Sequence, residues 1–120
     1  MRYLVLIGHD EKGGQELTSE QQEALFTAYQ KYEQELKKAG VLLGGDPLQP
    51  SSGAVRISGE AGKRKLLDGP FSESKEIIGG YVLLEVKSRD EAVEWASRCP
   101  AAQLGSWSYV ELREIQELPR

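Results

Sequence analysis

The chain opens with the stretch MRYLVLI, residues 1–7, in which every side chain after Arg2 is aliphatic or aromatic. A second stretch of this kind, GYVLLEV, covers residues 80–86. Alternate side chains of a strand point to opposite faces of a sheet. Both stretches therefore predict strands that are apolar on two faces and lie inside a sheet, and such a sheet needs cover on both of its sides.

A long helix is predicted between these two strands. Thr18 can cap its first turn, and Gln21 three residues later completes a capping box. Gly40 stands where a helix commonly ends. One apolar stripe at helical spacing would face the sheet, and its members are Leu25, Tyr29, Tyr32, Leu36 and Ala39.

A second, shorter helix is predicted after the second apolar strand. Ser88 and Glu91 have the spacing of another capping box. Pro100 would close the helix, because proline cannot continue one without losing a hydrogen bond. We expect an inner side made of Ala92, Val93, Ala96 and Cys99.

Four further segments read as extended chain. Residues 41–48 form a bent or edge element, because they are interrupted by glycine and proline. Residues 54–57 and 63–67 form two short strands with Gly59 and Gly62 supplying the turn. Residues 107–115 alternate apolar and charged side chains, which predicts a half-buried strand.

This order of elements is typical of the α+β ferredoxin-like fold, a split βαβ arrangement, over residues 1–120 as a single domain. Both helices would then cover the same face of one antiparallel sheet. The opposite face is also apolar, and a large exposed apolar patch is unusual on a monomer. We therefore predict a homodimer with twofold symmetry. The alternative is a monomer whose hairpin folds over the sheet.

Composition excludes several classes of partner. The formal net charge is −4, whereas nucleic-acid binders need an excess of positive charge. No apolar stretch approaches the length of about 20 residues that spans a membrane. Cys99 is the only cysteine, so no internal disulfide can form, which fits a reducing compartment. We expect a cytoplasmic protein that binds neither nucleic acid nor membranes.

The sequence also lacks the patterns of metal and cofactor sites. It has no cluster of Cys and His, so we expect no metal. It has no P-loop, nucleophile elbow or dinucleotide fingerprint. We therefore expect no cofactor, which leaves a small molecule as the conceivable ligand.

Residues 68–76 read DGPFSESKE, and residues 77–81 read IIGGY. This segment resembles the signature of the DGPF branch of the YCII-related family, roughly DGPFAETKE followed by a hydrophobic pair, two glycines and an aromatic residue. Only Ser72 and Ser74 depart from it. Residues 1–7, 43–50 and 91–96 also resemble the family, so the match covers nearly the whole chain. The resemblance implies a ferredoxin-like dimeric α/β barrel.

The same resemblance implies less about function. It points to small enzymes with a His–Asp pair, and one relative acts as a dehydrochlorinase. In the better-known branch the histidine lies within the first helix, where this chain has none. A catalytic histidine therefore cannot be transferred by position. Relatives of the DGPF branch also often occur beside, or fused to, extracytoplasmic-function sigma factors; this sequence shows no sigma-factor domain, so the resemblance implies such a link through genetic context only.

Two residues are candidates for catalysis. His9, the only histidine, could act as a general base near neutral pH, or it is a solvated loop residue beside Asp10. Asp68 could orient a base or bind a polar ligand. Alternatively it caps the turn before Gly69 and Pro70 by accepting backbone N–H groups.

The candidates for ligand binding surround Asp68 in the signature or face it from the preceding strand. They are Arg56, Gly69, Pro70, Phe71, Lys75 and Glu76. Gly69 and Pro70 also have a structural interpretation, as residues that shape a sharp turn. Three hypotheses follow: a small cofactor-free enzyme with Asp68 as its key carboxylate, a non-catalytic ligand-binding or regulatory module, and a dimeric scaffold.

Overall fold

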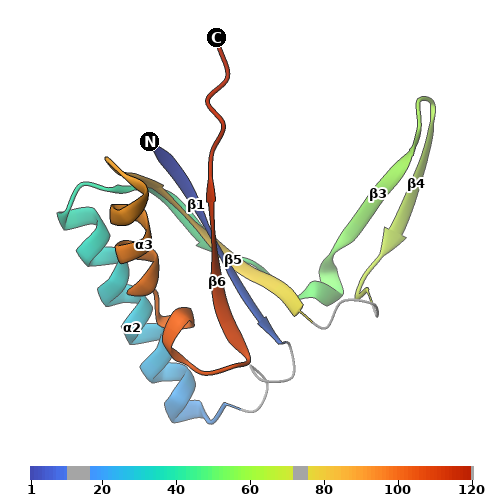
Figure 1. Ribbon diagram of the computed structural model, residues 1–120. Coiled ribbons are helices and arrows are strands. Elements are labelled where there is room, and N and C mark those ends of the chain that lie inside the picture. Colours follow the sequence, from blue (N-terminus) through green and yellow to red (C-terminus); the bar gives the residue numbers. More distant parts are fainter. Residues whose placement is uncertain (11–16, 72–75, 120) are drawn as a thin grey trace.

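The structure is a computed structural model that describes residues 1–10, 17–71 and 76–119 (Figure 1). It contains a four-stranded antiparallel sheet, two α-helices and a separate two-stranded hairpin. In chain order, the elements are β1 (Arg2–Asp10), α2 (Ser19–Lys38), β2 (Leu42–Pro47), the 3₁₀ helix η1 (Ser51–Gly53), β3 (Val55–Glu60), β4 (Lys63–Asp68), β5 (Glu76–Glu85), α3 (Arg89–Ser97), the 3₁₀ helix η2 (Pro100–Gln103) and β6 (Ser108–Glu114).

The sheet has the strand order β2-β5-β1-β6, and every neighbouring pair is antiparallel. This is the ferredoxin-like order, so the predicted α+β class is confirmed. The two stretches that are apolar on both faces became β1 and β5, the central pair, in which Leu4 lies opposite Leu83 and Val5 opposite Val82. β2 is an edge strand with a register shift between Leu42 and Gly44, as the glycines and proline of this segment predicted.

The core lies between the helices and one face of the sheet. Val5, Leu36 and Leu84 are almost completely buried. Helix α2 begins with the predicted capping box: the Thr18 hydroxyl accepts a hydrogen bond from the backbone N–H of Gln21, whose side-chain oxygen accepts one from Thr18. The box satisfies backbone donors that the first helical turn leaves free.

Helix α3 differs from its prediction in two details. Ser88 accepts a hydrogen bond from the backbone N–H of Glu91, but the Glu91 carboxylate accepts from Lys87 instead of Ser88, so only half of the predicted capping box forms. Val93 is 39% exposed, so its place on the inner side was wrong. Ala92 and Ala96 are four residues apart and share the buried face, whereas Val93 lies about 100° further around the helix.

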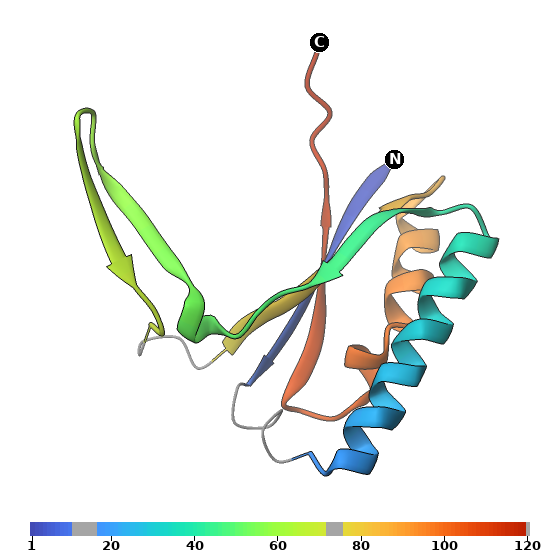
Figure 2. The same ribbon diagram turned by 180° about the vertical axis from the view of Figure 1, so that it is seen from behind.

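No described helix or strand covers the opposite face of the sheet. Leu4, Leu6 and Leu83 are half-buried there, on the side away from the helices. The hairpin β3–β4 does not fold over this face: the sheet lies between the helices and the hairpin in both views, and the hairpin stands away from it (Figures 1 and 2). The hairpin therefore does not cover this face in the way that the alternative of a closed monomer predicted.

Candidate binding groove

His9 lies near the end of β1, on the face of the sheet that the helices cover. Its Nδ1 atom is 3.3 Å from the backbone carbonyl oxygen of Asp10. A carbonyl can only accept, so this contact is a hydrogen bond in those forms of the ring that carry a proton on Nδ1. The ring lies against Gly79, where the pairing of β1 with β5 shifts by one residue.

His9 is one of the residues that line a groove of about 670 Å³ between α2 and the sheet. This volume is in the range of small-molecule sites. Its walls are mainly apolar and aromatic, and they include Ile7, Leu25, Phe26, Tyr29, Val82 and Trp107. The polar lining is sparser and includes His9, Gln30, Glu33, Asp46 and Ser108.

The deeper titratable groups near the groove are held in their neutral forms. Burial raises the pKa of the Tyr29 and Tyr32 hydroxyls well above the ordinary value. The Tyr32 hydroxyl donates to the backbone carbonyl of Trp95 at 2.8 Å. Burial also raises the pKa of the Cys99 thiol, whose Sγ donates to the Tyr29 hydroxyl at 4.0 Å. A thiol in this state is a poor nucleophile, because the thiolate is the reactive form.

Asp46 lies at the edge of the groove, but its side chain shares the sheet face of Leu6, away from the helices. It stands on β2 opposite Tyr81, and its Oδ2 atom accepts a hydrogen bond from the Tyr81 hydroxyl at 3.2 Å. The pair is exposed. The groove therefore has a largely neutral interior, with His9 at the sheet and the exposed Glu33 carboxylate, which pairs with Lys37, on α2.

A family model, the YCII-related domain, matches residues 1–116 of this chain. The chain belongs to the YCII-related family. An uncharacterized protein of Rhizobium meliloti (strain 1021) is 30% identical over 115 residues, which cover 96% of this chain and 92% of that protein. The resemblance noted in the sequence is thereby confirmed.

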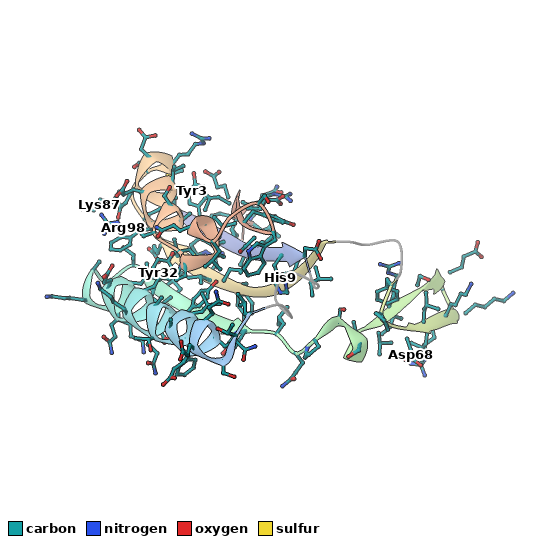
Figure 3. The ribbon with its side chains drawn as sticks, turned by 90° about the horizontal axis from the view of Figure 1, so that it is seen from below. Tyr3, His9, Tyr32, Asp68, Lys87 and Arg98 are labelled. Carbon is teal, nitrogen blue, oxygen red and sulfur yellow. The ribbon has the colours of Figure 1, made fainter. Side chains whose placement is uncertain are left out.

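The signature segment of this YCII-related protein is divided between two parts of the structure. Asp68 is an exposed residue at the end of β4, and Figure 3 shows it on the hairpin, far from His9. Its carboxylate makes no hydrogen bond or ion pair with the described residues, so the turn-capping interpretation has no support within one chain. The glycines at the end of the signature, Gly79 and Gly80, line the groove instead.

The other predicted ligand-binding residues lie with Asp68 at the base of the hairpin. The Arg56 guanidinium stacks on the Phe71 ring, 4.0 Å from its centroid. The backbone N–H of Gly69 donates to the carbonyl of Ala54 at 2.7 Å, and the peptide bond between Gly69 and Pro70 is cis. None of these residues lines the groove.

Two predicted residues close the signature. Lys75 lies outside the described residues. Glu76 is the first residue of β5, and its backbone is in register with Asp10 of β1. This pairing brings the chain that leaves the hairpin to the end of β1, next to His9.

Several lining residues were not singled out as site residues from sequence. Tyr29 and Tyr32 were assigned to the apolar stripe of the long helix, and Phe26, Asp46 and Ser108 were not considered. Phe26 directly follows Leu25 of the predicted stripe and is 65% exposed. The large aromatic side chain of Phe26, at the border of the apolar stripe, could have indicated a binding surface from the sequence alone.

The described residues show two further absences. None of their helices has the length and apolar character needed to cross a membrane. Within residues 1–10, 17–71 and 76–119, no three His, Cys, Asp or Glu side chains gather as metal ligands would.

Proposed function

We propose that this YCII-related protein binds a small, mainly apolar molecule in the groove between α2 and the sheet. The observation that carries the proposal is the combination of a volume of about 670 Å³ with apolar walls and few polar groups. Ligand pockets typically have this composition, in which a few polar groups fix the orientation of the bound molecule.

The lining indicates the chemistry of the ligand. Phe26, Tyr29 and Trp107 offer aromatic surfaces, which favour a planar or aromatic body. The neutral tyrosines and thiol nearby add no charge, and the lining carboxylate of Glu33 is already paired with Lys37, which disfavours a strongly ionic ligand.

A catalytic form of this function would use His9 as a general base and Asp68 as the carboxylate. His9 supports it, because it lines the groove and its ring contacts the Asp10 carbonyl, which would orient it. Asp68 lies on the hairpin of the same chain, away from the groove. A His9–Asp68 pair would therefore have to form between two subunits. Binding without chemistry needs no such pair, so we place it first.

The proposal includes a homodimer. The face of the sheet opposite the helices carries Leu4, Leu6 and Leu83, and the hairpin leaves it uncovered. A second copy of the chain, related by a twofold axis, would cover this face with the same residues. Such a contact would produce the dimeric barrel that the family resemblance implies.

The binding proposal is tested by a thermal-shift screen of aromatic and apolar metabolites. A ligand of the native state raises the melting midpoint by mass action. For each hit, titration of Phe26→Ser is compared with Val93→Ser, since both residues are exposed apolar side chains on helices but only Phe26 lines the groove. We expect at least fivefold weaker binding in Phe26→Ser alone. Equal binding in the two variants contradicts the proposed site.

A further inference from the structure

The hairpin has two unlike faces. In β3 and β4, Val55 is paired with Asp68 and Ile57 with Leu66, and paired residues point to the same side of a ribbon. The side chains of Val55, Ile57 and Leu66 form what we call the apolar face of the arm, with Asp68 at one end of it and Arg64 near the other. The opposite face carries Arg56, Ser58, Glu60, Lys63, Lys65 and Leu67.

The apolar face of the arm is largely exposed among the residues that the structure describes. Val55 is 52% exposed, Ile57 66% and Leu66 57%. A two-stranded hairpin with no further cover is marginally stable in water. A partner that buries these three side chains would give the arm the stability it lacks alone.

The dimensions of the chain also indicate a missing partner. A compact domain of 120 residues has a radius of gyration of about 14 Å, whereas this chain has 16.3 Å. A compact protein of 13.3 kDa exposes about 6,500 Å², whereas this chain exposes 9016 Å². The excess, about 2,500 Å², is of the size that each subunit buries in a large obligate dimer.

Charge and position favour a second copy of the chain as this partner. Residues 55–68 contain four basic and two acidic side chains, a net charge of +2, so the rest of the chain carries −6. The arm is therefore attracted to the body of another copy. It also stands on the side of the sheet whose apolar face is uncovered (Figures 1 and 2).

We propose that the hairpin β3–β4 is an exchange arm, which lays Val55, Ile57 and Leu66 on the body of a second copy of this chain. The proposal rests on the homodimer proposed above. Twofold symmetry gives each subunit one arm to donate and one surface to receive. Asp68 lies on the same face of the arm as Val55, so docking carries this carboxylate to the partner subunit.

The test compares two neighbouring leucines that point to opposite faces. Leu66 and Leu67 are 57% and 49% exposed. Sedimentation equilibrium measures the dimer dissociation constant for the wild type, for Ile57→Gln/Leu66→Gln and for Leu67→Gln. We expect twice the chain mass of 13.3 kDa for the wild type. The dissociation constant should rise at least tenfold in the double variant and stay within twofold in Leu67→Gln.

The possible outcomes test the arm proposal and the dimer proposal separately. A wild type that stays monomeric at micromolar concentration overturns both proposals. A dimer that is equally tight in all three proteins overturns the arm and leaves a dimer formed by the sheet alone. Equal weakening in Leu67→Gln and the double variant also overturns the arm, since it removes the distinction between its faces. Circular dichroism shows that each variant keeps its fold.

Discussion

The imidazole of His9 occupies the space that a side chain at Gly79 would fill. A β-carbon at position 79 would lie 2.5 Å from Nε2 and 2.8 Å from Cδ2 of His9. The register of β1 and β5 shifts at this point, so Gly79 has no direct partner in β1. One glycine of the family signature therefore leaves room for the only histidine of the chain, although the two are 70 residues apart.

The first prediction follows from this contact. Gly79→Ala should displace the His9 ring and destabilise the fold by about 1–3 kcal/mol, the usual cost of overpacking. Gly44→Ala is the control, since a β-carbon at Gly44 meets nothing within 4 Å. Because the chain has one histidine, nuclear magnetic resonance reports its ring signals without overlap. A ring signal that is unchanged in Gly79→Ala but shifted in Gly44→Ala would contradict the contact.

Most of the fold could be predicted because its signals are local. The cap at Thr18, the glycine at position 40 and the two apolar strands each depend on a few neighbouring residues. The errors occurred where three-dimensional geometry decides which side chains point inward and which groups form hydrogen bonds. Val93 is apolar, yet Ala92 and Ala96 already take the inward positions of α3. The Glu91 carboxylate accepts from Lys87, one residue earlier than the sequence pattern indicates.

The second prediction concerns the two faces of β5. Leu84 is fully buried under the helices, whereas Leu83 points to the uncovered face. Leu84→Asp should unfold the protein, because an unpaired buried carboxylate and a lost core side chain together cost more than about 4 kcal/mol. Leu83→Asp should keep the fold and lower the mass measured by light scattering toward that of one chain. A folded, fully dimeric Leu83→Asp would rule out the sheet face as the interface.

The third prediction is a loss of stability at alkaline pH. Burial raises the pKa of the Cys99 thiol from its ordinary value of 9.0, and burial raises the pKa of Tyr29 from 10.0. Above these ordinary values the unfolded chain binds fewer protons than the folded one, so the free energy of unfolding falls as pH rises. Urea unfolding at pH 8, 9.5 and 10.5 measures the fall. Cys99→Ala should remove the fall in the free energy of unfolding that begins near pH 9, and it should keep the fall that Tyr29 causes at higher pH.

The candidate site was less predictable than the fold. His9 was identified because it is the only histidine, but its groove depends on α2 and on the register of β1 with β5. The signature suggested that Asp68 and the residues after it act together. The structure separates them, because the hairpin leaves the sheet before Asp68 and the chain returns to it at Glu76. A continuous motif in sequence therefore does not establish a continuous site within one subunit.

The last prediction tests Asp68 directly. Its carboxylate is exposed and has no hydrogen bond or ion pair with the described residues of its own chain. Asp68→Asn and Asp68→Ala should therefore change the free energy of unfolding by less than about 0.5 kcal/mol, as is usual for such surface positions. A turn cap would instead lose about 1 kcal/mol in Asp68→Ala and little in Asp68→Asn. The ligand titrations are then repeated on both variants. Because Asp68 does not line the groove of its own chain, we expect their affinities to equal that of the wild type. Loss of the ligand response in both, with the fold and the dimer intact, would contradict this expectation and assign Asp68 to the groove of the partner subunit.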